Sequence, residues 1–166
     1  LVLATGFDAI TGALNRIDIR GRGGERLRDA WADGPRSYLG LSIAGFPNLF
    51  MIAGPGSPSV LTNMMVSIQH HVDWIAEAMT YLARRQLATI EPSAEAQDAW
   101  VKEVEMVANS TLFPACNSWY VGANIPGKPR VFPAYVGFPP YAEKCAAVVA
   151  NGYEGFSLAP QTSAAE

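Results

Sequence analysis

This sequence lacks an excess of charge of either sign. Only 16% of its 166 residues are charged, and 12 basic residues stand against 15 acidic ones, for a formal net charge of −3. Binding to a nucleic acid requires an excess of Lys and Arg to neutralise phosphate groups. This chain has no such excess, so we expect no nucleic-acid partner. The apolar share of 49% excludes a disordered chain. So few charges indicate a large interface, as in a fragment or a subunit with an obligate partner.

Long apolar runs and cysteines are also scarce. Glycine, proline, asparagine or a charged residue interrupts every apolar run well before the roughly 18 residues that a membrane-spanning helix needs, so we expect no membrane partner. The two cysteines, Cys116 and Cys145, lie far apart, with neither a CxxC pair nor a histidine at metal-ligand spacing. This pattern indicates no metal site and no redox dithiol. Two free thiols are typical of a reducing compartment, and we expect a cytoplasmic protein.

Three segments in the first third of the chain have β-type patterns. Residues 1–6 form an apolar, β-prone run without a starting methionine or a positively charged segment, so we expect the chain to begin inside a strand. Residues 16–27 are predicted to form a hairpin that turns at a Gly-Gly pair, in preference to an RNA-binding RGG tract. The continuous apolar run 49–53 predicts a buried strand of parallel type that ends at Gly54.

Helical patterns dominate the remainder. Between 63 and 87 there is no glycine or proline, and apolar residues recur at spacings of three and four. We predict an amphipathic helix whose apolar face carries Ile68, Val72, Ile75, Met79 and Leu82. Further helices are predicted for 93–109 and 140–151. The aromatic- and glycine-rich segment 110–139 predicts a long functional loop, and 159–166 a loose tail.

The segment 54–59 lies between the predicted strand and the long helix. A loop in this place can offer backbone N–H groups and the positive end of the helix dipole to an anion or an electron-rich ring. It lacks the GxGxxG and GxxxxGK[ST] spacings, and a tight crossover turn is the alternative. His70 and His71 are adjacent on the helix and cannot ligate one metal ion, so we favour a packing or surface role. Because no carboxylate pair or Ser/His/Asp set can be assembled, an enzymatic function would need a cofactor.

Three stretches, in this order, resemble the Baeyer–Villiger monooxygenases, flavoenzymes that convert ketones to esters or lactones. They are Leu-Val-Leu-Ala-Thr-Gly-Phe-Asp at 1–8, the run from Gly-Phe-Pro-Asn at 45–48 to Gly-Pro-Gly-Ser-Pro at 54–58, and Ser-Trp-Tyr at 118–120 with Gly-Ala-Asn-Ile-Pro-Gly-Lys at 122–128. The resemblance covers nearly the whole chain. It implies an α/β fold, the C-terminal half of the FAD-binding, Rossmann-like domain of a flavoprotein with two dinucleotide-binding domains.

The resemblance also implies how the chain is divided. Residues 1–8 would be the strand and hinge that return from the NADPH domain. Residues 9–158 would be the C-terminal half of the FAD-binding domain, with a mobile loop at about 110–139, and 159–166 a flexible tail. The glycine fingerprints for FAD and NADPH, the family fingerprint ending in His-x-x-x-Trp and the catalytic arginine would lie in the upstream half of the same polypeptide. We therefore expect no catalytic residue in this segment and no activity from it alone.

By this resemblance, the whole enzyme would use FAD, NADPH and O2 to oxidise an aryl or bulky cyclic ketone through a flavin peroxide. Met64 would lie against FAD, and the indole N–H of Trp119 would bond to NADP, although a Trp119 packed beneath a long loop is the alternative. The substrate pocket would be lined by Ser59, Val60, Leu61, Thr62 and Pro133. Pro133 replaces a longer, flexible side chain of the family, and 136–141 has one glycine fewer than the usual pattern, so the identity of the ketone stays open.

Two other functions stay open. An N-hydroxylating flavin monooxygenase shares the Ala-Thr-Gly strand, but Trp119 and the Ala-Asn-x-Pro-Gly-Lys stretch at 123–128 speak against it. A stand-alone, non-catalytic binding module could also reuse this half-fold. An upstream sequence with two glycine fingerprints would distinguish the enzyme from the module.

Overall fold

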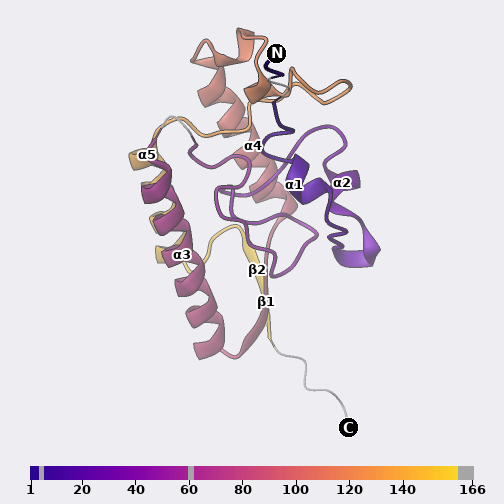
Figure 1. The fold of residues 1–166 in the computed structure, drawn as a ribbon. Helices are drawn as coiled ribbons and strands as arrows, with labels where there is room; N and C mark the ends of the chain where they lie inside the picture. Colours follow the sequence, from indigo (N-terminus) through magenta and orange to yellow (C-terminus); the bar gives the residue numbers. More distant parts are fainter. Residues whose placement is uncertain (4–5, 60–61, 161–166) are drawn as a thin grey trace.

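The structure is a computed structural model that describes residues 1–3, 6–59 and 62–160 (Figure 1). Within these ranges the chain is mixed α/β, with helices arranged around one two-stranded antiparallel sheet. The α-helices are α1 (Gly12–Asn15), α2 (Leu27–Ala30), α3 (Met64–Arg84), α4 (Ala94–Asn109) and α5 (Phe138–Ala150). The 3-10 helices are η1 (Arg22–Gly24), η2 (Phe113–Ala115) and η3 (Trp119–Val121), and the strands are β1 (Leu87–Pro92) and β2 (Phe156–Pro160).

Helix α3 confirms the predicted long helix but not its predicted buried face. The side chains that it buries are Ser67, His71, Trp74, Ala78 and Leu82. Of the predicted face only Leu82 is buried, and Val72 and Met79 are 42% and 59% exposed. The prediction was wrong because apolar residues cover a wider arc of α3 than the core of this chain contacts. Periodicity alone could not choose the buried half of that arc.

Helices α4 and α5 confirm the other two predicted helices and complete the main core. The Ser93 hydroxyl oxygen accepts the N–H of Ala96 at 3.1 Å and so caps the start of α4. Helix α5 begins two residues earlier than predicted, since prolines are tolerated in a first helical turn. Trp74, Trp100 and Tyr141 lie together in the core that these two helices form with α3 and β1.

The two-stranded sheet was not predicted from the sequence. Ile90 of β1 pairs with Leu158 of β2, so residues 159–160 belong to a strand and the predicted tail was wrong there. The other predicted tail residues, 161–166, lie outside the described residues. Asn48 lies along the second edge of β1, where its N–H donates to the oxygen of Ile90 and its Oδ1 accepts the N–H of Ile90, both at 3.0 Å. Short strands that pair only over a long sequence separation give little local signal.

The predicted strand at 49–53 is an irregular segment. Asn48 and Ala53 at its two ends have positive φ angles of +59° and +54°, which break an extended conformation. Its apolar side chains divide between two cores, because Met51 packs in the cluster around Leu27 and Phe50 packs against the main core. The predicted burial holds only in part, since Met51 is buried but Ile52 is 51% exposed, and the run forms no strand.

The other two β-type predictions also failed in part. Residues 1–3 are extended and exposed, and they pair with no strand in the described ranges; residues 4–5 of the predicted strand lie outside them. At 16–27 the chain does turn at Gly23 and Gly24, with φ angles of +66° and +80°. The turn is closed by a single bridge between Arg20 and Arg26 and not by a ladder of pairs.

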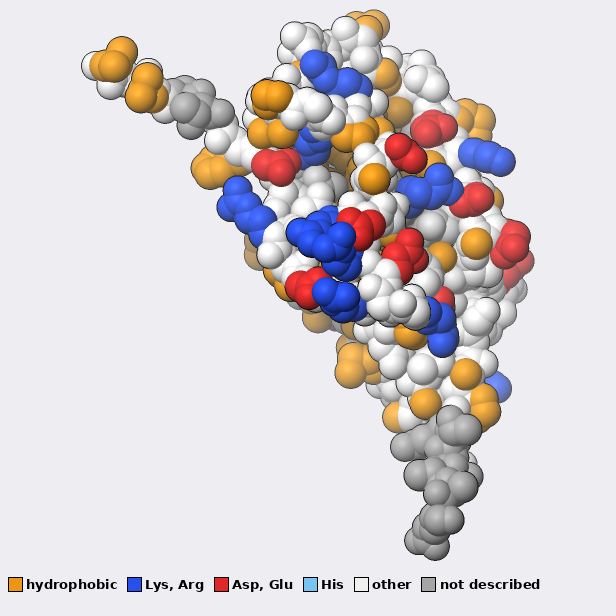
Figure 2. All heavy atoms as spheres, turned by 90° about the vertical axis from the view of Figure 1, so that its right-hand side faces the viewer, with side chains coloured by type: hydrophobic (Ala, Val, Ile, Leu, Met, Phe, Trp, Pro, Cys, Tyr) orange, Lys and Arg blue, Asp and Glu red, His pale blue; other side chains and the backbone are white. Residues whose placement is uncertain are grey.

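Basic and acidic side chains alternate on the face that carries α1 and α2 (Figure 2). The ion pairs of this region include Arg20–Asp18 at 3.0 Å, Arg26–Asp29 at 2.7 Å, Arg22–Glu91 at 2.7 Å, and Arg36–Asp98. The last two pairs join this face to β1 and α4. In the part of the chain that the structure describes, no helix is both long enough and apolar enough to cross a membrane.

Candidate functional site

Residues 53–59 form the loop that leads into α3, and neighbouring segments hold its backbone oxygens. Trp100 of α4 donates its indole N–H to the carbonyl oxygen of Gly56 at 3.1 Å. The buried hydroxyl of Ser37 donates to the carbonyl oxygen of Pro55. Both bonds are buried, so breaking either one would leave an unsatisfied polar group in the core.

Close backbone packing fixes the same loop from the other side. A Cβ atom added at Gly40, whose φ is +69°, would lie only 2.5 Å from the backbone nitrogen of Ser57. A Cβ atom added at Gly54 would lie 2.4 Å from the carbonyl oxygen of Gly40. Only glycine fits either position, so these glycines are required for the loop to pack where it does.

The loop pairs in parallel with the end of the long segment that precedes α5. Gly56 donates its N–H to the carbonyl oxygen of Pro133 at 2.8 Å, and Tyr135 donates its N–H to the carbonyl oxygen of Ser57 at 3.0 Å. A parallel bridge joins Pro58 to Tyr135. The structure therefore brings the predicted pocket residue Pro133, which is buried, next to the loop that carries Ser59.

These bonds bear on the two interpretations of the loop. The N–H of Gly56 is used by Pro133, and the N–H of Ser57 donates to the carbonyl oxygen of Gly54 at 3.1 Å. Pro55 and Pro58 have no N–H to offer. These four residues therefore present no free backbone N–H to an anion, as expected of a tight crossover turn, whereas the positive end of the α3 dipole is unaffected by these bonds.

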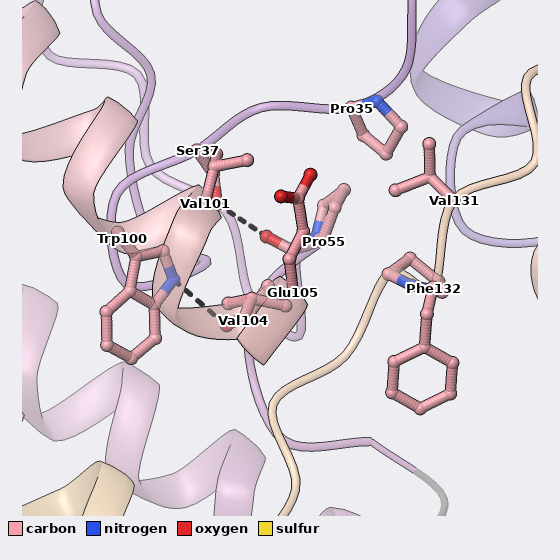
Figure 3. Close-up of a pocket in the computed structure, with 11 residues that line it drawn as sticks. Pro35, Ser37, Pro55, Trp100, Val101, Val104, Glu105, Val131 and Phe132 are labelled. Atoms are coloured by element: carbon pink, nitrogen blue, oxygen red, sulfur yellow. Dashed lines mark hydrogen bonds between the residues drawn. The ribbon is translucent and has the colours of Figure 1, made fainter. Parts of the chain in front are cut away.

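A small pocket lies beside this pairing (Figure 3). Its volume is about 20 Å³, and its lining includes Pro55, Trp100, Val104, Phe132 and Pro133. This is room for about one water molecule, which is too little for a ketone. A substrate pocket that uses Pro133 must therefore be completed by atoms outside the described residues.

The remaining predicted pocket and flavin residues lie where the loop meets α3. Thr62 donates its N–H to the carbonyl oxygen of Ser59 at 2.9 Å, which turns the chain into the helix, and Met64 is the first helical residue. The Ser59 hydroxyl oxygen is buried and has no hydrogen-bond partner in the described part of the chain. Val60 and Leu61 lie outside the described residues. The start of α3 thus combines the positive end of a long helix with an unused polar side chain.

Trp119 lies at the start of η3, in the long segment between α4 and α5. Its side chain is 52% exposed, and its ring meets that of Tyr120 edge to face at 5.2 Å. Packing beneath the loop therefore does not account for this residue, because half of its surface is free to meet another group. The same segment is tied to the N-terminal residues, since Asn124 donates its side-chain N–H to the carbonyl oxygen of Phe7 at 2.9 Å.

His71 of α3 forms a buried chain of hydrogen bonds that the sequence did not reveal. Its Nδ1 accepts the N–H of Ala53 at 3.0 Å, and its Nε2 lies 2.9 Å from the hydroxyl of Tyr141. Tyr141 in turn donates to the carbonyl oxygen of Leu39 at 2.7 Å. A neutral His71 with its proton on Nε2 satisfies every group in the chain. Burial, and to a lesser degree the neighbouring His70, lowers the pKa of His71 to about 4, so the ring is neutral at pH 7.

Two kinds of reactive group can be checked directly in the described residues, a metal-ligand cluster and an activated thiol. No group of three or more metal-ligating side chains occurs in the described ranges. Cys145 is buried, and burial raises the pKa of its thiol to about 12, which makes it unreactive. The arrangement can shape a pocket and place a helix N-terminus beside a ligand.

Comparisons with known proteins identify this arrangement, although no family profile matches the chain. The chain is 45% identical over 160 residues to the acetone monooxygenase (methyl acetate-forming) of Gordonia sp. (strain TY-5), which covers 95% of this chain and 30% of that protein. It is 44% identical over 154 residues to a Baeyer–Villiger monooxygenase of Pseudooceanicola batsensis, and the alignment covers 92% of this chain and 28% of that protein. It is also 43% identical over 159 residues to the phenazine N-monooxygenase PhzNO1 of Lysobacter antibioticus, covering 95% and 29%.

Solved structures agree with these relatives. Cyclohexanone monooxygenase from Rhodococcus sp. Phi1 bound to NADP+ matches with a TM-score of 0.90 at 43% identity, over 93% of this chain and 29% of that one. The OTEMO complex with FAD and NADP matches with a TM-score of 0.86 at 40% identity, over 93% and 28%. The fold is thus that of a segment of a monooxygenase.

More narrowly, the chain is a homologue of the Baeyer–Villiger monooxygenases over nearly its whole length, so the resemblance found in the sequence is confirmed. It spans about 30% of the length of the curated relatives that it matches.

Proposed function

We propose that this chain is part of a Baeyer–Villiger monooxygenase that uses FAD, NADPH and O2 to convert a ketone to an ester or lactone. The observation that carries the proposal is the fold match, at a TM-score of 0.90 and 43% identity, to a cyclohexanone monooxygenase bound to NADP+. Because the chain spans only about 30% of such proteins, the rest of the enzyme, with its catalytic groups, would belong to the upstream half of the same polypeptide.

In the proposed enzyme, residues 9–158 would form the C-terminal half of a Rossmann-like FAD-binding domain. Residues 1–8 would lead back from the NADPH domain, and about 110–139 would be a mobile loop over the site. The bond from Asn124 to Phe7 supports this arrangement, because it ties that loop to the proposed inter-domain hinge. The free thiols Cys116 and Cys145 suit a cytoplasmic protein.

The start of α3 fits a flavin. An anionic or acceptor-rich ring edge is favoured at the positive end of a 21-residue helix, and the unpartnered Ser59 hydroxyl could donate to it. Met64, at the first helical position, would pack against the ring system. When bound, FAD supplies the oxygen-transfer chemistry that these side chains lack; the chain's own part is to hold the ring and to exclude water.

The same geometry suits a substrate wall on the approach to α3. Ser59 and Thr62 lie on that approach, and the hydrogen bond between Gly56 and Pro133 places Pro133 beside it. Val60 and Leu61 are proposed to complete the wall on the ground of the family resemblance. Trp119, which is half exposed, is proposed to donate its indole N–H to NADP.

A second candidate, an N-monooxygenase, is favoured by one observation. The phenazine N-monooxygenase PhzNO1 is 43% identical to this chain, close to the value for the ketone-oxidising relatives. The complete polypeptide, supplied with NADPH, should be offered cyclohexanone and phenazine separately. We expect a lactone from the ketone. An N-oxide from phenazine with no lactone would establish the second candidate, and no NADPH-dependent product from either would favour the stand-alone binding module.

A further inference from the structure

Four segments that are distant in the sequence meet at His71. Ala53 is the first residue of the loop, His71 lies on α3, Tyr141 lies on α5, and Leu39 lies in the segment that packs against the loop. The three bonds that join them run in series from the N–H of Ala53 to the carbonyl oxygen of Leu39. His71 and Tyr141 are both fully buried, so no water competes for these bonds.

Ala53 is the residue at which this chain of bonds controls the backbone. Its φ is +54°, in the left-handed region, which residues with a Cβ atom adopt rarely and at a cost that their surroundings must offset. The bond from its N–H to Nδ1 of His71 is such a constraint. Since residues 54–59 follow directly, the conformation of Ala53 sets the direction in which the loop leaves the core.

We propose that His71 is a positioning residue for the 53–59 loop, and that with Tyr141 it holds the substrate wall proposed above at its correct distance from α3. The inference rests on the proposed function only for its effect on ketones. Its effect on the loop itself depends on nothing outside this chain.

The chemistry of the imidazole makes this role depend on its neutral form. A protonated His71 would turn Nδ1 from an acceptor into a donor, facing the N–H of Ala53, and the bond would be lost. The titratable groups that face His71 are His70, with ring centroids 6.1 Å apart, and Tyr141, at 5.6 Å. The Ala53 and Leu39 segments contribute only a backbone N–H and a backbone carbonyl. No anion among these contacts stabilises the charged ring.

Glutamine and leucine are the informative replacements in the complete polypeptide. In His71→Gln, the side-chain oxygen can accept from Ala53 while the amide nitrogen donates to Tyr141, with no titration. His71→Leu puts an apolar side chain in the same buried place and removes both bonds. Tyr141→Phe removes the hydroxyl that bonds to His71 and Leu39 but keeps the aromatic ring. It is the substitute test if His71→Leu does not fold. His70→Gln is the matched control, because it makes the same change one residue away from the loop contact.

Hydrogen exchange of the peptide spanning 50–59 is the primary measurement. We expect about tenfold faster exchange in His71→Leu, an intermediate increase in Tyr141→Phe, and wild-type exchange in His71→Gln and His70→Gln. Unchanged exchange in both His71→Leu and Tyr141→Phe would overturn the inference, as would equal acceleration in His71→Gln. This measurement stands even if the protein oxidises no ketone.

The second measurement is the ratio of kcat/KM values for a bulky and a small ketone. His71→Leu should change this ratio severalfold, whereas His71→Gln should keep it. In the wild type the ratio should stay constant from pH 7.5 to 5, where His71 is neutral, and should drift as the pH falls from 5 to 4, whereas in His71→Gln it should not drift. A loss of thermal stability in His71→Leu with an unchanged ratio would show that His71 is only a core residue. Absence of all ketone oxidation in the wild type would instead refute the proposed function.

Discussion

The carbonyl oxygen of Pro133 accepts the N–H of Gly56 at 2.8 Å, and this bond joins two segments that lie far apart in the sequence. It places a residue from the end of the long segment after α4 beside the loop that leads into α3. The proposed substrate wall is therefore built from both segments. Any displacement of Pro133 would therefore reach the proposed wall through this contact.

A substitution in the wall should alter the choice of ketone and not the reduction of the flavin. Leu61→Ala should favour a bulky ketone over a small one by roughly tenfold to a few hundredfold, because fitting one methylene in an apolar pocket is worth about 1–3 kcal/mol. Steady-state kcat/KM for both ketones, beside the rate of flavin reduction by NADPH, tests this. A loss of equal size for both ketones that follows the melting temperature would contradict the pocket role.

Trp119 should affect how well NADPH consumption is coupled to product. Trp119→Phe keeps an aromatic ring but removes the indole N–H, and Trp119→Ala removes both. If the N–H holds the nicotinamide cofactor, both variants should divert NADPH toward hydrogen peroxide, because the reaction site would lose its shelter from water. The ratio of NADPH consumed to ester formed is the measurement. If Trp119→Phe still forms one ester for each NADPH consumed, the indole N–H is not needed and Trp119 acts only through the packing of its ring.

The crossover turn can be tested with two glycines that share a backbone conformation. Gly40 and Gly23 have φ angles of +69° and +66°, but a Cβ atom at Gly40 would lie 2.5 Å from the nitrogen of Ser57, whereas a Cβ at Gly23 would meet nothing within 4 Å. Gly23→Ala should cost about 1 kcal/mol from its conformation, and Gly40→Ala a further 1–3 kcal/mol or so from overpacking. Denaturant unfolding of the complete protein measures the loss of stability in both variants. Equal losses would mean that the loop shifts to accommodate the added methyl group and is not tightly packed.

Stability should depend on pH through His71. The unfolded histidine titrates near its ordinary pKa of 6.5, whereas burial lowers the folded pKa to about 4. Between these values the unfolded state binds more protons, so the free energy of unfolding should decrease as the pH falls from 6.5 to 4, by at most about 3 kcal/mol. The decrease should be smaller in His71→Gln, which retains only the weaker contribution of His70, whose pKa is also lowered. Identical pH profiles for the wild type and His71→Gln would contradict the buried, neutral assignment.

The sequence predicted the elements whose signals are local. The uninterrupted 3.6-residue periodicity of apolar residues defines α3 and α4 within a few residues, and in the structure the side chains of Asn63 and Ser93 cap the starts of these helices. The sheet was missed because β1 and β2 become strands only by pairing with each other. The run 49–53 has the composition of a strand, but left-handed residues at Asn48 and Ala53, which the sequence does not mark, turn it into an irregular segment.

The family motifs, and the resemblance that they carry, predicted the candidate site residues, whose roles stay predictions. They grouped Pro133 with the segment 59–62, and the structure brings Pro133 to the loop that leads into that segment. They gave no indication of His71, because its role depends on Ala53 and Tyr141, which reach it only after the main core has formed. The buried face of α3 was missed for a related reason, since this chain covers only part of the helix's apolar arc.

The most direct test of the account is oxidation of cyclohexanone by the complete polypeptide, loaded with FAD, in the presence of NADPH and ¹⁸O₂. The account predicts a lactone that carries one ¹⁸O atom, formed with consumption of one NADPH for each lactone. Consumption of NADPH with hydrogen peroxide as the only product from cyclohexanone and from other cyclic and aryl ketones would contradict it, and so would a lactone whose new oxygen comes from water.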